Sequence, residues 1–147
     1  MKIGGTVGEI LRNKGSTVWS IPPSMTVFDA IQSMADRDVG ALPVVLDNDL
    51  VGLLSERDYT RKIVLQGKSS RQTTVGEIMS VNPNIATPNH TVEECMSMMT
   101  AKRVRHLPVV ADGRLIGIVS IGDLVKWTIS AQSAALEQME NYIKGSY

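Results

Sequence analysis

The sequence predicts an α/β fold of the α+β kind, with two tandem β-α-β-β-α repeats and a long C-terminal helix. Three observations support this prediction. The chain matches itself at an offset of about 65 positions, and such self-similarity decides the architecture. Each half holds a helix pattern that opens on a threonine. Each half then holds two short apolar runs separated by a turn, which is typical of a strand-turn-strand pair.

The internal repeat is too dense to arise by chance. Roughly 14 of about 36 aligned positions agree, against about one in fifteen expected from typical composition. The matches include Leu42–Val45 over Leu107–Val110 and Asp58 over Asp123. We therefore divide the chain into repeat 1 at residues 1–66, a polar linker at 67–74 and repeat 2 at 75–147.

The composition is that of a soluble globular chain of 147 residues, with 43% hydrophobic and 20% charged residues. Lys plus Arg equals Asp plus Glu at 15 each, so no global positive field exists to bind nucleic acid. Apolar runs are far shorter than the roughly 20 residues that span a bilayer, and the N-terminus lacks a secretory signal. We expect a cytoplasmic protein whose partners include neither nucleic acid nor a membrane. The lone Cys95 and two distant histidines predict neither a disulfide nor a metal site.

Each repeat begins with a short helix and an extended stretch. The helices are predicted at Val7–Arg12 and Val75–Met79, and a few extra residues at Asn13–Thr17 form a loop in repeat 1. Strands are predicted at Thr17–Ile21 and Asn84–Thr87. The first run is ended by Pro23 and the second by Pro88.

A capped helix follows in each repeat. Thr26 and Thr91 each precede an acidic residue by three positions, which is a helix N-terminus signature. Apolar residues then follow the 3-4 spacing of a helix that buries one face. Cys95 falls on that face and is predicted to lie in the core.

The rest of each repeat is predicted as two strands and a helix. The strands are Ala41–Leu46 with Leu50–Leu54, and Leu107–Ala111 with Leu115–Val119. The helices are Glu56–Gln66 and the much longer Ile121–Ile143. The apolar stripe of the last helix, with Trp127 and Tyr142, is longer than one repeat covers. It either docks on a partner subunit or frays as a free tail.

A Gly-x-x-Ser-x-x-Asp motif links the last strand of each repeat to its last helix, with Ser55 and Asp58 in repeat 1 and Ser120 and Asp123 in repeat 2. The spacing places the serine and the aspartate together at a helix N-terminus. A carboxylate there can accept both hydroxyls of a ribose, and the serine with the free amides suits a phosphate. The alternative is a plain helix-capping pattern, and the two roles can coexist.

These residues resemble the CBS (cystathionine-β-synthase-type) domain, which occurs as tandem pairs called Bateman modules. The resemblance rests on Leu42–Val45 with Gly52–Asp58 and on Leu107–Val110 with Gly117–Asp123. It implies pseudo-twofold packing of the repeats, two clefts that bind adenosine compounds such as AMP, ATP or NAD(H), and pairing into a homodimer. It further implies that Asp58 and Asp123 hold riboses, with Ser55 and Ser120 nearby.

By the same resemblance, Arg105 and His106 stand where basic residues reach a nucleotide phosphate, and the equivalent positions in repeat 1 are Gly40 and Ala41. We therefore expect Arg105 and His106 to favour a phosphorylated ligand beside the second motif. The alternative for His106 is a strand residue bonded to backbone. Thr87 matches a nucleotide-contacting position of the family, and otherwise is a strand-end hydroxyl.

Repeat 1 has its cations after the motif. Arg57 and Arg61 share a helix face at i, i+4 spacing and are candidate phosphate ligands. The alternative is a solvated face on which acidic neighbours offset the charge. Gly40 would let a flat base approach closely, although turn packing explains a glycine equally well.

The function expected from this sequence is nucleotide sensing. The chain has no nucleophile elbow, no phosphate-binding loop and no dinucleotide-binding turn, so we expect a binding protein and not an enzyme. The expected protein is a stand-alone module that binds AMP, ATP or NAD(H) and regulates an unknown partner. The alternatives are a constitutive structural homodimer without ligand and, least favoured, an enzyme that uses NAD.

Overall fold

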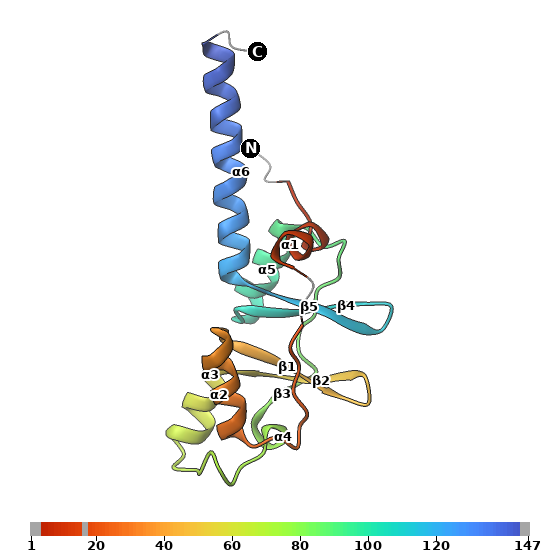
Figure 1. Ribbon diagram of the computed structural model, residues 1–147, viewed down its shortest axis with the longest axis vertical. Helices are drawn as coiled ribbons and strands as arrows, with labels where there is room; N and C mark the ends of the chain where they lie inside the picture. The colour runs from red at the N-terminus through yellow and green to blue at the C-terminus, as the bar shows by residue number, and fades with distance from the viewer. Residues whose placement is uncertain (1–3, 16–17, 145–147) are drawn as a thin grey trace.

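The computed structural model describes residues 4–15 and 18–144, and its elements form two stacked halves with a projecting C-terminal helix (Figure 1). Repeat 1 contains α2, β1, β2, α3 and a π-helical turn, preceded along the chain by α1. Repeat 2 contains α4, β3, α5, β4, β5 and α6. The bounds are α1 Val7–Lys14, α2 Val27–Arg37, β1 Ala41–Leu46, β2 Asp49–Ser55, α3 Glu56–Tyr59, the π turn Thr60–Val64, α4 Val75–Ile78, β3 Ser80–Val81, α5 Val92–Lys102, β4 His106–Ala111, β5 Arg114–Ser120 and α6 Ile121–Ile143.

The two halves share one hairpin design, so the predicted tandem fold is confirmed. In β1–β2, Val44 pairs with Gly52 and the register shifts at the next residue. In β4–β5, Val109 pairs with Gly117 and the same shift follows. Antiparallel strands with matching irregularities indicate that both repeats follow one template.

The main helices begin where the sequence predicts. The Thr26 hydroxyl accepts from the amide of Asp29 at 3.1 Å, and the Thr91 hydroxyl accepts from the amide of Glu94 at 3.0 Å. Such caps satisfy amides that have no partner within the helix, and each contributes about 1 kcal/mol. Cys95 is fully buried, as expected, and burial raises the pKa of its thiol to about 11.

The first strand predicted in each repeat is reduced to one isolated bridge. Ile21 bridges Val44 and Ala86 bridges Val109, both in parallel. Proline follows Ile21 directly and follows Ala86 by two residues, and it supplies no amide for a ladder to continue. Thr17, where one prediction began, lies outside the described residues.

Three further details differ from the prediction. The helix predicted at Glu56–Gln66 is one α-helical turn followed by a π-helical turn. The unpredicted strand β3 pairs with Gly52 and Leu53 of β2, so a segment of repeat 2 extends the sheet of repeat 1. The loop predicted at Asn13–Thr17 starts later, because α1 continues to Lys14.

The lead helices are exchanged between the repeats. Val7 and Ile10 of α1 pack in the core of repeat 2, whereas Val75 and Ile78 of α4 pack in the core of repeat 1. Backbone hydrogen bonds fix the exchange, with Val7 donating to the carbonyl of His90 at 2.9 Å. Each repeat therefore completes its core with a helix from the other half.

Only the base of α6 packs on the body, where Leu124 is fully buried. Beyond that base the helix projects as a rod (Figure 1). None of the helices within residues 4–15 and 18–144 is long and apolar enough to cross a bilayer.

Candidate functional site

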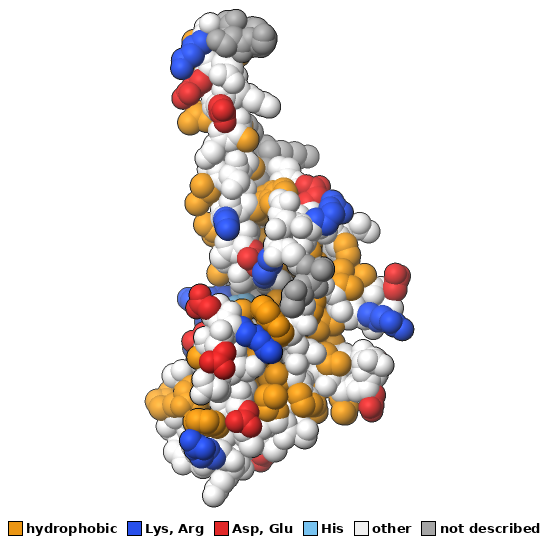
Figure 2. Space-filling model, viewed as in Figure 1, with side chains coloured by type: hydrophobic (Ala, Val, Ile, Leu, Met, Phe, Trp, Pro, Cys, Tyr) orange, Lys and Arg blue, Asp and Glu red, His pale blue; other side chains and the backbone are white. Residues whose placement is uncertain are grey.

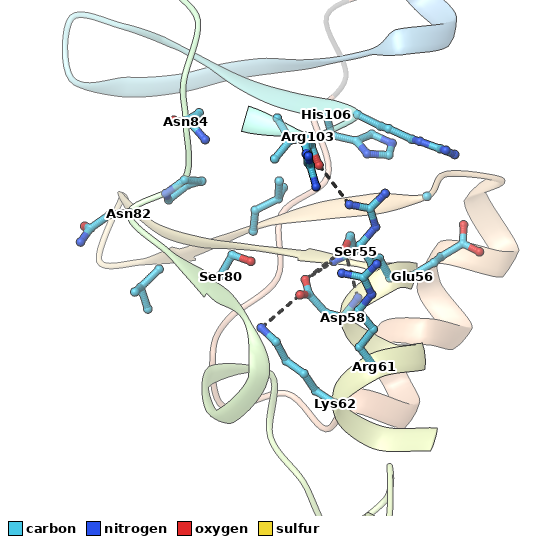
Figure 3. A pocket seen from close by; sticks show the side chains of 17 residues that line it. Ser55, Glu56, Asp58, Arg61, Lys62, Ser80, Asn82, Asn84, Arg103 and His106 are labelled. Atoms are coloured by element: carbon cyan, nitrogen blue, oxygen red, sulfur yellow. Dashed lines mark hydrogen bonds and ion pairs between the residues drawn. The ribbon is translucent and has the colours of Figure 1, made fainter. Parts of the chain in front are cut away.

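A cleft of about 570 Å³ opens between the repeats at the first Gly-x-x-Ser-x-x-Asp motif (Figure 3). Five segments line it: Gly40 just before β1, the junction of β2 with α3, the π-helical turn, the segment at residues 80–84 and the residues that lead into β4. The first three belong to repeat 1 and the last two to repeat 2. The cleft therefore forms only when the two repeats pack together.

Asp58 lies in this cleft and is only 8% exposed. Its Oδ2 accepts from the Ser55 amide at 2.9 Å and from the Ser55 hydroxyl at 3.1 Å. These contacts belong to a capping box, so the capping role expected as an alternative is confirmed. The other oxygen, Oδ1, lies 3.2 Å from the ammonium of Lys62 (Figure 3). One oxygen thus serves the helix and the other meets a cation of the cleft.

The charged residues that line the cleft are mostly cations. Five Lys and Arg side chains stand against the two carboxylates of Glu56 and Asp58. The five are Arg57, Arg61, Lys62, Arg103 and Arg105, so both repeats contribute. Such a surplus inside a concave site concentrates anionic ligands.

Two of the five cations hold the cleft together. Arg57 donates to the carbonyl of Arg103 at 3.0 Å, which ties repeat 1 to repeat 2. Lys62 donates to the carbonyl of Ile78 at 2.8 Å, which ties the π-helical turn to α4. The guanidinium groups of Arg61 and Arg105 make no hydrogen bond or ion pair with the described part of the chain, so these two forks are open to a ligand.

Arg105 and His106 line the cleft that holds Asp58, because the packing of the repeats brings the start of β4 against the start of β1. His106 also pairs with Ser120 of the second motif. The expected preference of the two residues for a phosphate beside that motif stays a prediction. A Cβ added to Gly40 would lie 3.3 Å from Cε1 of His106. The expected contact of Gly40 with a cleft ligand stays a prediction.

His106 begins β4 opposite Ser120, as its alternative as a strand residue requires. Burial lowers the pKa of His106, and the positive charges of Lys14 and Arg105 lower it further, whereas Asp123 acts in the opposite direction. The imidazole is therefore neutral at neutral pH in the unliganded protein.

The second motif is closed by a lysine from α1. The Ser120 amide donates to Asp123 at 2.8 Å in a capping box like that of repeat 1. The ammonium of Lys14 donates to Asp123 at 2.7 Å and to the carbonyl of Ile118 at 2.9 Å. Burial raises the pKa of Asp123, but the Lys14 contact and the Ser120 hydrogen bonds outweigh it and hold the pKa below its usual value.

A cavity of about 380 Å³ lies beside this ion pair, between α1 and α6, with Lys126 and Trp127 in its wall. Leu11 of α1 covers Gly117 of β5, where an added Cβ would lie 2.7 Å from a Leu11 methyl. The lead helix thus packs on the strand that delivers the second motif.

Three predicted site residues, Ala41, Thr87 and Ser120, line neither of these cavities. Ala41 is 2% exposed and belongs to the core. The amide of Thr87 donates to Nδ1 of His90 at 2.8 Å, and its hydroxyl lies 3.2 Å from the same nitrogen. Ser120 caps α6, so all three residues serve the local fold. Among the described residues, no group of three or more His, Cys, Asp or Glu side chains is placed to hold a metal ion.

The family model described as "CBS domain" matches residues 7–65 and again residues 75–130. The chain belongs to the CBS-domain family. The two matched ranges lie within the predicted repeats at 1–66 and 75–147, and residues 66–74 separate them.

Relatives and solved structures agree with this assignment. The chain is 40% identical over 152 aligned positions to the CBS domain-containing protein CBSX3, mitochondrial, of Arabidopsis thaliana, covering 97% of this chain and 73% of the relative. The crystal structure of CBS domain NE2398 is 48% identical and covers 86% of this chain and 98% of the other, with a TM-score of 0.82.

A second similar structure holds a nucleotide. The crystal structure of CBSX2 in complex with AMP is 28% identical, covers 88% of this chain and 99% of the other, and has a TM-score of 0.71. A protein of this CBS fold therefore binds an adenosine monophosphate.

Sequence reasoning missed several lining residues of the CBS cleft. Ser80, Asn82 and Asn84 follow α4, and Arg103 ends α5. The exchange of α4 into the core of repeat 1 brings the first three there, and no local pattern encodes it. The repeat aligns Arg103 with Asp38, and both are left-handed C-caps, but this alignment does not predict a place in the cleft.

Proposed function

We propose that the cleft at Asp58 binds an adenine nucleotide and that the chain is a stand-alone regulatory module. The observation that carries this proposal is the convergence of cations from both repeats on one cleft that also holds the buried carboxylate of Asp58. The CBSX2 complex with AMP supports the ligand class.

The cleft offers a partner for each part of such a ligand. The Oδ1 oxygen of Asp58 accepts a ribose hydroxyl when Lys62 turns toward a phosphate. Arg61 and Arg105 supply forks that match phosphate oxygens. Leu53 and Val81 add apolar surface on which a flat base packs. Because the cations outnumber the carboxylates, ligands with two or three phosphates gain more than AMP does.

Regulation follows if the nucleotide changes the packing of the repeats. The cleft walls come from both repeats, so a ligand that bridges Arg61 and Arg105 stabilises one relative arrangement over others. Only such differential affinity shifts a conformational equilibrium. We further propose that two copies of the chain pair and that the pair acts on a separate partner protein. A cytoplasmic location stays a prediction.

The second candidate function is a constitutive structural module without ligand. The two capping boxes favour it, because they explain both Ser-x-x-Asp motifs through helix stability alone. Calorimetric titration of the full chain with AMP, ADP, ATP, NADH and S-adenosylmethionine separates the candidates. Micromolar binding of an adenine nucleotide supports sensing, whereas no heat with any of the five compounds supports the structural role.

A further inference from the structure

An apolar seam runs along the exposed face of α6. Its residues follow a 4-3-4-3-4 spacing and are Val125, Ile129, Gln132, Leu136, Met139 and Ile143. The five apolar members are between 45% and 79% exposed. In Figure 2 hydrophobic side chains mark the left edge of the projecting rod.

The spacing is that of a coiled coil and not of a helix that packs on its own body. A seam with a mean period of 3.5 residues stays on one face when two helices supercoil. The body contacts lie on another face of α6, where Leu124 is buried and Trp127 packs against the core of repeat 2. The 23 residues of α6 make a rod of about 35 Å, long enough for three heptads.

The charged residues beside the seam favour a second copy of this chain as the partner and an antiparallel orientation of the two helices. In heptad terms Val125 and Ile129 hold positions d and a, so Lys126 and Glu140 both hold position e. In an antiparallel pair, the e positions of one helix face the e positions of the other. When Val125 packs against Ile143 of a second copy, Lys126 lies beside Glu140 of that copy. Twofold symmetry forms this pair twice.

The same register brings small side chains together at the symmetry axis. Ser133 meets its own copy on one flank and Ala135 meets its own copy on the other. In a parallel pair Lys126 and Glu140 do not meet, because Glu140 lies beside Ala135 of the other helix. A parallel pair also places Gln132 against Gln132 in the seam.

We propose that α6 pairs with α6 of a second copy as an antiparallel coiled coil, with Lys126 opposite Glu140. This inference rests on the proposed function, which has two copies of the chain pair, and it assigns that contact to the exposed face of α6. The two CBS bodies then lie at opposite ends of the helix pair, with both nucleotide clefts away from the seam.

The first test is Leu136→Glu in the full chain, measured by sedimentation equilibrium. The wild type is expected as a dimer, and this variant weakens it at least a hundredfold because a carboxylate replaces a core side chain. Leu65→Glu is the matched control, since Leu65 is an exposed leucine of repeat 1, and it leaves the dimer unchanged. If the dimer survives Leu136→Glu, the coiled coil of α6 is overturned but the pairing of two copies is not. If the wild type is a monomer, both are overturned.

The second test addresses direction. Lys126→Glu and Glu140→Lys each turn two attractive pairs into two repulsive ones and weaken the homodimer about tenfold at low ionic strength. An equimolar mixture of the two variants restores wild-type affinity, because each chain complements the other. Failure to restore it overturns the antiparallel register. Rapid disulfide formation by Gln132→Cys does so as well, because position 132 meets itself only in a parallel pair.

Discussion

Lys14 donates to Asp123 across 109 positions of sequence, at 2.7 Å. The equivalent aspartate of the other repeat, Asp58, has its cation on its own helix, at 3.2 Å from Lys62. The two Gly-x-x-Ser-x-x-Asp motifs are therefore alike in sequence but differ in the cation that contacts the aspartate. One carboxylate is held by the exchanged lead helix, and the other stands in a cationic cleft.

We predict that the wild type binds one adenine nucleotide per chain. A ligand at the second motif must break the contacts of Lys14 with Asp123 and with the carbonyl of Ile118, whereas at the first cleft Lys62 needs only to turn from Asp58 toward the ligand. Calorimetric titration gives the stoichiometry, and a value near one is expected. Two equivalent sites per chain would show that the Lys14 contact does not close the second motif.

Lys14→Met is expected to lower the free energy of unfolding by about 1 kcal/mol at neutral pH, the scale of a charge-assisted hydrogen bond that is partly exposed. The folded-state pKa of Asp123 lies below its unfolded value of 3.8. Its stabilising effect is therefore present above the unfolded pKa and is lost as the pH falls through the folded pKa. The difference between wild type and variant in urea unfolding should vanish in strong acid. Lys102→Met, which removes an exposed lysine at the end of α5, serves as the control, and an equal effect of both variants would contradict this account.

Arg61→Gln and Arg105→Gln are each expected to weaken ATP binding about tenfold, because each removes a charge-assisted contact to phosphate. Adenosine, which has no phosphate, should bind both variants as it binds the wild type. Competition titrations with the two ligands give the comparison. Arg114→Gln, at the exposed start of β5, should change neither affinity. A parallel loss of adenosine binding would assign the two arginines to the base or ribose instead.

Nucleotide binding is expected to tighten as the pH falls from 7.5 toward 5.5. The pKa of His106 is lowered in the free protein, so the ring is neutral there, and a bound phosphate beside it raises that pKa and favours proton uptake. Calorimetry in buffers of different ionisation enthalpy measures the proton taken up. His106→Gln should abolish the uptake; uptake that persists in this variant would place the titrating group elsewhere.

Local patterns predicted much of this fold. The threonine caps, the helical spacing and the strand-turn-strand pairs depend on residues near each other in the chain, and the repeat confirms each pattern by its copy. The lone bridges at Ile21 and Ala86 differ from the predicted strands because ladder formation depends on what lies alongside, which is a tertiary property.

The candidate site was harder to predict for the same reason. Ser55, Asp58, Arg57 and Arg61 line one cleft, as their shared motif indicates. Arg105 joins them from the other half of the chain, and Lys14 reaches Asp123 through the exchanged helix α1. The packing of one repeat against the other determines the positions of Arg105 and Lys14. The spacing of residues within a single repeat does not reveal that packing.

The measurement that tests the central claim most directly is calorimetric titration of Asp58→Asn with ATP and ADP. Asparagine keeps the size of the side chain but loses the charge that accepts ribose hydroxyls, so affinity should fall at least tenfold. Loss of part of the cap costs about 1 kcal/mol, and circular dichroism should still show a folded chain. Asp36→Asn, on the exposed face of α2, is the control and should bind as the wild type does. Undiminished affinity in folded Asp58→Asn would contradict the assignment of this cleft.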